Sequence, residues 1–213
     1  MDNYNYYKGM NGIIQELTGL LKTKNIGTDS DRALLLDFQA TLETKPEKAI
    51  KLEKDALAQI ETITVDNARL VSNLHANLGG LYRMNGHPDL AREHMEKSIS
   101  LLDQFNLLHI NDSIPQIANY AMFLTEQQEP ERGISELQKL SGIIKEYHSD
   151  DCLDYAKVQE TLGTIYLMTA NLPQAKTHFK RAFKIYEKIW ADEPEMIEAK
   201  YQEIQELYPQ IGF

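Results

Sequence analysis

Apolar residues in this chain recur at steps of three and four, the spacing of a helix that buries one face. One such stripe runs through residues 70–82, and a second runs from residue 88 to about residue 105. Asn85-Gly86 between the stripes is a turn signal. The pattern predicts two antiparallel helices joined by a short turn.

This helix pair recurs with a period of 42 residues. Pro46, Pro88 and Pro130 each open an apolar-periodic run, and the next step falls at Leu172, beside Pro173. Proline suits the first position of a helix, because its missing N–H would be unpaired there. We therefore expect helices to start near residues 46, 88, 130 and 173, with inter-repeat turns near 107–111 and 148–151.

Small residues keep the same period and indicate where the two helices of a pair approach closely. The pattern predicts that Gly79 and Gly163 lie against Ala91 and Ala175. A large residue at Gly163 would overpack that contact, at a cost of about 1–3 kcal/mol.

The repeated unit resembles the tetratricopeptide repeat. Two units carry its signature, as Leu78, Gly79, Tyr82, Gly86, Ala91, Met95 and Ser98, and as Leu162, Gly163, Tyr166, Ala175, Phe179 and Ala182. The other two units are degenerate, and the first has Asp37 where a small residue belongs. A period of 42, longer than the usual 34, is similar to the kinesin-light-chain subtype and to bacterial peptide-sensing regulators of the Rap type.

The resemblance implies an all-α fold, a right-handed α-solenoid of antiparallel helix pairs with a capping helix at each end. The expected parts are an N-terminal amphipathic capping helix (1–27), four repeats (about 28–65, 66–111, 112–150 and 151–192) and a C-terminal capping helix (193–213). The first repeat has an apolar face at Leu34, Phe38 and Leu42. We interpret this face as a dock for the N-terminal helix, with a ligand pocket as the alternative.

A solenoid of this kind offers a concave wall made by the first helix of each repeat. Asn77 and Asn119 lie one period apart on that wall. In kinesin-light-chain-like repeats the matching asparagine holds the backbone of a bound extended peptide, a task that suits an amide because it both donates and accepts. The alternative is a solvated surface or a hydrogen bond to the next repeat. The residues predicted to contact a peptide are Asn73, Asn77, Arg83, Asn119, Met122, Glu126, Lys157, Thr161, Thr164 and Met168.

The charge balance narrows the choice of partner. The 213 residues include 22 Lys and Arg against 32 Asp and Glu, for a net charge of −10. This excess of acid argues against nucleic acid and against an anionic membrane surface. The N-terminal segment does not resemble a signal peptide, and the single cysteine, Cys152, excludes an intramolecular disulfide. We expect a cytoplasmic protein.

Motifs of catalysis or metal binding are not recognisable. The sequence has no phosphate-binding glycine loop, nucleophile elbow or zinc-hydrolase histidine pair. His148, Asp151 and Cys152 lie in a polar turn with no standard zinc spacing, and we interpret the scattered His75, His87 and His94 as surface residues. The chain is therefore predicted to be no enzyme, with no catalytic residue, metal or cofactor.

The leading hypothesis is an adaptor that binds a protein or an extended peptide segment. Self-assembly is the structural alternative, in which an end face forms a homodimer. A standalone sensor of signalling peptides is a further alternative. About 28 residues precede the repeats, too few for the helix-turn-helix output module that such sensors usually carry.

Overall fold

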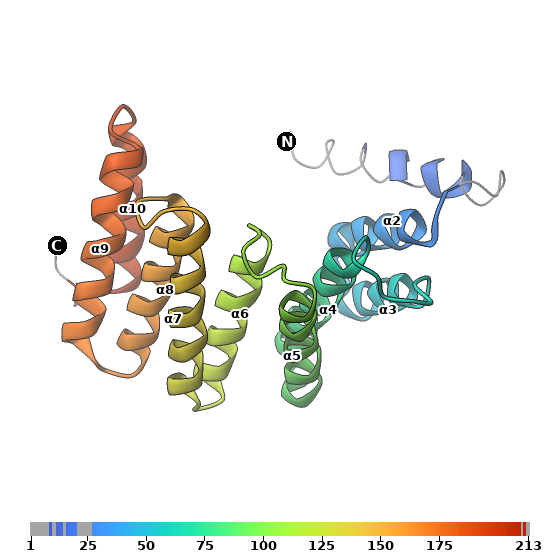
Figure 1. Cartoon of the computed structure of the whole chain (residues 1–213), viewed down its shortest axis with the longest axis horizontal. Coiled ribbons are helices and arrows are strands. Elements are labelled where there is room, and N and C mark those ends of the chain that lie inside the picture. The colour runs from blue at the N-terminus through green and yellow to red at the C-terminus, as the bar shows by residue number, and fades with distance from the viewer. Residues whose placement is uncertain (1–8, 10–11, 15, 21–26, 210, 212–213) are drawn as a thin grey trace. The chain divides into compact units, whose positions relative to one another are not determined.

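The computed structural model describes residue 9, residues 12–14, 16–20 and 27–209, and residue 211 (Figure 1). Within these residues every regular element of secondary structure is a helix, and no strand occurs. The helices with defined bounds are α2 (Asp29–Leu42), α3 (Pro46–Leu57), α4 (Ala68–Met84), α5 (Pro88–Gln104), α6 (Ser113–Glu126), α7 (Pro130–Tyr147), α8 (Leu153–Met168), α9 (Leu172–Ile189) and α10 (Pro194–Leu207).

The predicted helix starts are confirmed. Helices α3, α5 and α7 begin at Pro46, Pro88 and Pro130, and α9 begins at Leu172 with Pro173 in its first turn. The expected inter-repeat turns also fall between helices, since α5 ends at Gln104 and α6 begins at Ser113, and since α8 begins six residues after the end of α7.

The turns inside three of the helix pairs share one backbone conformation. Residues 86, 128 and 170, each one period apart, have φ of +72°, +65° and +58°. In each turn the next residue donates its N–H to a carbonyl five residues earlier, at 2.7–2.9 Å (His87 to Tyr82, Glu129 to Leu124, Asn171 to Tyr166). This left-handed helix ending favours glycine, yet only the first of the three positions is a glycine.

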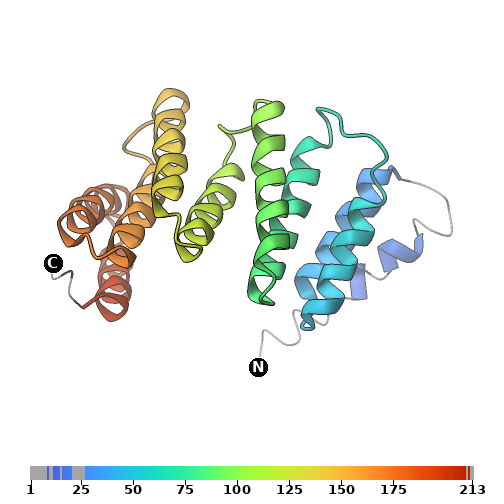
Figure 2. The same cartoon turned by 90° about the horizontal axis from the view of Figure 1, so that it is seen from below.

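The chain divides into two compact units, Met1–Leu107 and Leu108–Phe213. In unit 1, α2 packs on α3, α3 on α4 and α4 on α5; in unit 2, α6 packs on α7, α7 on α8, α8 on α9 and α9 on α10. The two helices of a pair are joined by a short connection, as the α2–α3 and α8–α9 pairs show (Figures 1 and 2). Each unit therefore holds two helix pairs, and unit 2 also holds α10.

The two helices of a pair approach each other closely at the glycines. A Cβ on Gly79 would lie 2.6 Å from Met95 Cγ and 3.3 Å from the Ala91 carbonyl oxygen. A Cβ on Gly163 would instead meet the Phe179 ring at 2.9 Å. The nearest side chain to Gly163 is thus the ring of Phe179, one turn further along α9 than Ala175, and the predicted contact with Ala175 stays a prediction.

The predicted N-terminal capping helix lies largely outside the described residues. Where it is described, at 12–14 and 16–20, the backbone is helical, and Ile14 is buried. Gln39 Nε2 donates to Thr18 Oγ1 at 3.2 Å, so this segment contacts α2. Leu34 and Phe38 nevertheless keep 41% and 46% of their surface exposed. Both side chains are thus partly covered, and the dock for the N-terminal helix stays a prediction.

Candidate functional site

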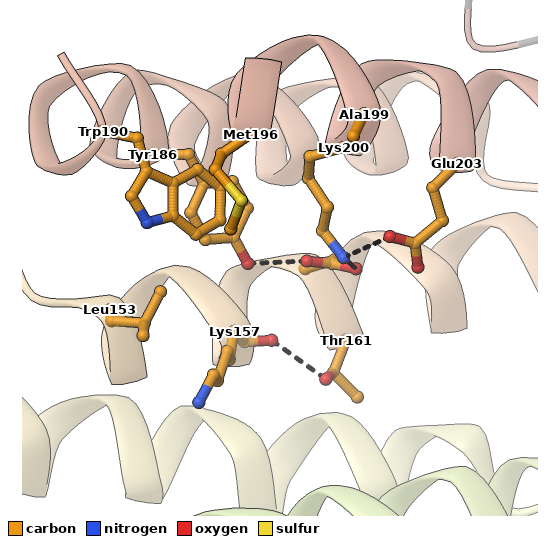
Figure 3. A pocket seen from close by; sticks show the side chains of 10 residues that line it. Leu153, Lys157, Thr161, Tyr186, Trp190, Met196, Ala199, Lys200 and Glu203 are labelled. Carbon is orange, nitrogen blue, oxygen red and sulfur yellow. Dashed lines mark hydrogen bonds and ion pairs between the residues drawn. The ribbon is translucent and has the colours of Figure 1, made fainter. Parts of the chain in front are cut away.

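Unit 2 contains a groove between α8, the end of α9 and α10, which we call the α8–α10 groove (Figure 3). Its volume is about 490 Å³. The lining side chains are Leu153, Lys157, Glu160 and Thr161 from α8, Tyr186 and Trp190 from α9 and the residue after it, and Met196, Ala199, Lys200 and Glu203 from α10. The α10 helix, predicted only as a cap, thus forms one wall of the groove.

One end of the groove is apolar. The Trp190 ring stacks on Tyr186 with centroids 4.8 Å apart and an interplanar angle of 8°. Figure 3 shows Met196 beside this stack and Leu153 on the facing helix. Met196 is 45% exposed. Tyr186 is only 2% exposed, so Trp190 and Met196 provide the apolar surface that solvent reaches at this end.

A row of hydrogen-bonded polar groups crosses the groove beside that apolar end (Figure 3). Glu160 accepts from the Tyr186 hydroxyl at 2.6 Å, and its carboxylate lies 2.8 Å from Lys200 Nζ. Lys200 also donates to Glu203 at 3.0 Å. Burial alone would lower the pKa of Lys200, but the hydrogen bond and charge of Glu160, together with Glu203, raise it. Lys200 therefore stays charged and ties α10 to α8.

Two of the predicted peptide-contacting residues lie in this groove. The ammonium group of Lys157 is 3.8 Å from Asp154, and the Lys157 side chain remains 56% exposed. The Thr161 hydroxyl donates to the Lys157 carbonyl oxygen at 3.0 Å. Thr164 likewise donates to the Glu160 carbonyl oxygen at 3.1 Å. The two threonine hydroxyls are thus bonded to their own helix, while the lysine head group reaches solvent.

The other predicted residues are divided between the units. On α6 and α8 of unit 2, Asn119, Glu126 and Met168 are exposed and Met122 is half-buried. On α4 of unit 1, Asn73 and Arg83 are half-buried and Asn77 is exposed. The structure thus brings Lys157 and Thr161 together in the groove, and the role of the whole set in binding stays a prediction.

Asn77 is engaged within unit 1. Its amide nitrogen donates to Asp37 Oδ1 at 2.8 Å and to Glu53 Oε1 at 3.2 Å. It therefore links α4 to both helices of the preceding pair. The alternative stated for the paired asparagines was a hydrogen bond to the next repeat, and Asn77 instead bonds to the preceding one. A bound peptide would have to compete with two carboxyl groups for this amide.

Glu53 in this cluster is buried, and the sequence did not single it out. It is 2% exposed, and its Oε2 atom meets no donor within the described residues. Burial, with the nearby charge of Asp37 and a hydrogen bond to it, raises the pKa of Glu53 to about 9. Burial also raises the pKa of Asp37. The raised pKa keeps Glu53 protonated at neutral pH. One signal in the sequence could have indicated this cluster, namely an acidic Asp37 at a small-residue position.

The interpretation of His75 and His94 as surface residues is wrong. Their Nδ1 atoms are 2.9 Å apart, and both rings are half-buried between α4 and α5. The His94 ring also stacks on Tyr82, with centroids 5.4 Å apart. His87 is exposed, as expected. The nineteen-residue separation hides the pair in the sequence, because it becomes a contact only when the two helices pack.

The residues of the 148–152 turn have separate partners. His148 Nε2 lies 3.0 Å from the His109 carbonyl oxygen, Asp151 pairs with Lys188, and Cys152 Sγ accepts from the Tyr155 N–H at the start of α8. Nowhere in the described part of the chain do three or more His, Cys, Asp or Glu side chains gather as a metal site. No helix among the described residues has the length and apolar character to cross a membrane.

Comparison with protein families identifies the repeats of unit 2. Residues 113–188 match a family model described as tetratricopeptide repeat. This span covers the two helix pairs α6–α7 and α8–α9. No curated protein sequence matches the chain.

Solved structures with the same fold cover most of the chain. BtubC (BKLC) from P. vanneervenii is 18% identical with a TM-score of 0.72, and the match covers 88% of this chain and 75% of that one. The nearly identical TPR-like repeats of a putative kinesin light chain from Podosopora anserina give 15% identity and a TM-score of 0.67, covering 88% and 92% of the two chains. MamA gives 15% identity and a TM-score of 0.58, covering 88% and 94%. At these identities the likeness shows the fold, an α-solenoid of consecutive helix pairs.

Proposed function

Because the chain is a tetratricopeptide-repeat protein with repeats similar to those of kinesin light chains, we propose that it is a non-catalytic adaptor that binds an extended segment of a protein partner in the α8–α10 groove. Tetratricopeptide-repeat proteins bind other proteins, and their stacked helices form the extended surfaces that do so. The observation that carries the proposal is the groove itself, with an exposed apolar end beside charged groups.

The apolar end supplies the anchor. Trp190 and Met196 belong to the residue types enriched at binding surfaces, and a few such residues contribute most of the binding free energy of an interface. Lys157 supplies orientation, because its ion pair with Asp154 is long, at 3.8 Å, and its own side chain is 56% exposed. Such a pair is weak and can be exchanged for a carboxylate of the partner. Contact of a partner backbone with Asn119 is a further part of the proposal.

A matched pair of methionine variants tests the site. Met196→Arg places a bulky charge at the apolar end of the groove, whereas Met84→Arg makes the same change at a side chain of unit 1 that is 82% exposed. Each variant and the unaltered chain are used to capture partners from the native cell, and the captured proteins are compared by mass spectrometry. We expect Met84→Arg to retain the partners and Met196→Arg to lose them.

Capture by Met196→Arg of the same partners in the same amounts would contradict the groove as the binding site. Trp190 is the only tryptophan of the chain, so its fluorescence reports binding of a peptide from the identified partner directly. A peptide that binds without changing this fluorescence would also place the site elsewhere. Light scattering of the partner-free chain tests self-assembly, since the adaptor proposal expects a monomer. The proposal includes the cytoplasmic location and the absence of nucleic-acid and membrane partners that the sequence predicts.

A further inference from the structure

The histidine pair of unit 1 lines a cavity that is separate from the α8–α10 groove. The cavity has a volume of about 510 Å³ and is lined by His75 of α4 and by Glu93, His94, Glu96, Lys97 and Ser100 of α5. Two imidazoles and two carboxylates thus border one solvent-accessible space. Imidazole nitrogen is a preferred ligand of Zn²⁺, Cu²⁺ and Ni²⁺.

Unit 2 provides an internal comparison, because its residues stand 84 positions after their counterparts in unit 1. Gln159 replaces His75, and its Oε1 lies 2.9 Å from His178 Nδ1, the same distance as in the histidine pair. Tyr166 stacks on His178 as Tyr82 stacks on His94. The contact between the two helices is therefore made equally well by glutamine, so packing does not require the second imidazole.

The other differences between the residues that line this cavity and their counterparts in unit 2 have the same direction. Glu93 and Glu96 of unit 1 correspond to Thr177 and Lys180 of unit 2, while Lys97 corresponds to Arg181. Unit 1 thus has an imidazole and two carboxylates where unit 2 has an amide, a hydroxyl and an ammonium group. At each of these three positions, unit 1 has a side chain that binds cations better than its counterpart in unit 2.

We propose that His75 and His94 bind a divalent transition-metal ion of the Cu²⁺ type through their Nδ1 atoms. Two metal–nitrogen bonds of about 2.05 Å span a separation of 2.9 Å when the angle at the metal is about 90°. The ring centroids are 5.1 Å apart with Nδ1 facing Nδ1, so each ring turns to direct its lone pair at the ion. This is the angle between neighbouring ligands of the tetragonal sites that Cu²⁺ prefers. Water completes the coordination, with Glu93 and Glu96 bordering the same cavity.

Metal binding needs no proton to leave the protein. In the present contact one Nδ1 carries a hydrogen and donates it to the other. When that imidazole moves its hydrogen to Nε2, both Nδ1 atoms present a lone pair. Burial, with the charges of His94 and Lys97, lowers the pKa of His75 to about 4, and burial lowers the pKa of His94. The lowered pKa of each ring favours the neutral imidazole, which is the form that a metal ion binds.

Titration of the full chain with Cu²⁺ at neutral pH tests the site. We expect one equivalent to bind by calorimetry, an electron paramagnetic resonance spectrum that shows two nitrogen ligands, and a higher melting temperature because the ion links α4 to α5. His75→Gln recreates the pair of unit 2, so it keeps the hydrogen bond and loses the ligand. Removal of an outer-shell partner typically lowers metal affinity by about tenfold or more. Removal of a direct ligand should lower it at least as much, so we expect His75→Gln to bind Cu²⁺ about tenfold more weakly or worse.

His87→Gln is the matched control, since His87 is exposed and does not line the cavity. It should leave Cu²⁺ binding unchanged. Equal affinity in His75→Gln and the unaltered chain, or no equivalent bound at all, would overturn the proposal. The resonance spectrum of the unaltered chain decides the matter without any variant, because a spectrum with fewer than two nitrogen ligands also overturns it.

Discussion

Glu53 of α3 accepts a hydrogen bond from the Asn77 amide of α4 at 3.2 Å, and this contact joins two successive helix pairs of unit 1. The same amide bonds Asp37 of α2. In unit 2 the positions 84 residues later are Ala121, Leu137 and Thr161, and the first two are fully buried apolar residues. Unit 1 thus has two carboxyl groups, Asp37 and Glu53, at positions where unit 2 has two buried apolar side chains.

The raised pKa of Glu53 makes the stability of unit 1 depend on pH. The folded state keeps the proton up to about pH 9, whereas an unfolded glutamate loses it near pH 4.3. The stabilisation is complete below the unfolded pKa and is lost as the pH rises toward 9. Glu53→Gln, which needs no proton, should raise the free energy of unfolding at pH 8 by about 1–3 kcal/mol and have little effect at pH 4. Asp55→Asn, at an exposed position of α3, is the control, and equal pH profiles for all three chains would contradict the raised pKa of Glu53.

Two glycines of α7 should respond oppositely to alanine. A Cβ on Gly133 would lie 2.6 Å from the Ala121 carbonyl oxygen, and a backbone atom cannot yield as a flexible side chain does. Gly133→Ala should therefore lower the free energy of unfolding by about 1–3 kcal/mol. A Cβ on Gly142 meets nothing within 4 Å, so Gly142→Ala should raise it by about 0.5–1 kcal/mol. Urea denaturation compares the two, and equal effects would show that α6 and α7 are not in close contact at Gly133.

The left-handed position 170 is occupied by alanine. Ala170 has φ of +58°, a conformation that costs a residue with a Cβ about 1–2 kcal/mol. Ala170→Gly should stabilise the chain by about 0.5–1 kcal/mol, because the added flexibility of the unfolded state offsets part of the gain. The reciprocal change Gly86→Ala, at φ of +72°, should destabilise it. Thermal melting measures both, and a destabilising Ala170→Gly would refute this account of the turn.

Lys200 should hold α10 in place. Its side chain and that of Glu160 are each 19% exposed, and Lys200→Met removes the charge while keeping the apolar stem. The Glu160 carboxylate would then lose its contact with Lys200 and keep the hydrogen bond that it accepts from the Tyr186 hydroxyl. Amide hydrogen exchange in α10 should become faster by about tenfold, which corresponds to about 1.4 kcal/mol, with little change in α6.

Lys188→Met is the control for that measurement. Lys188 pairs with Asp151, and both side chains are more than half exposed. Such a surface pair contributes little to stability, so exchange in α10 should be unchanged. Equal exchange rates in the two variants would mean that packing, and not the Lys200 ion pair, holds α10 against α8.

The local pattern of the sequence determined the helices and their period. Prolines at 46, 88 and 130 predict helix starts because their effect depends only on the backbone of the same residue. The apolar stripes predict which face of each helix is buried, and the resemblance of the repeats predicts a tetratricopeptide-repeat fold. Position 37 also indicated a departure from regular repeat packing, because an aspartate replaces a small residue there.

Only the tertiary structure decided which side chains meet. Asn77 bonds to Asp37 and Glu53, and His75 bonds to His94. An added Cβ on Gly163 would contact Phe179. Each contact joins two helices, and the 42-residue period does not specify how those helices are rotated about their axes. The α8–α10 groove likewise depends on how the last helix lies against the preceding pair. The physical reason is that helix formation is governed by residues three and four positions apart, whereas these contacts depend on the packing of whole helix faces, which the sequence encodes only collectively.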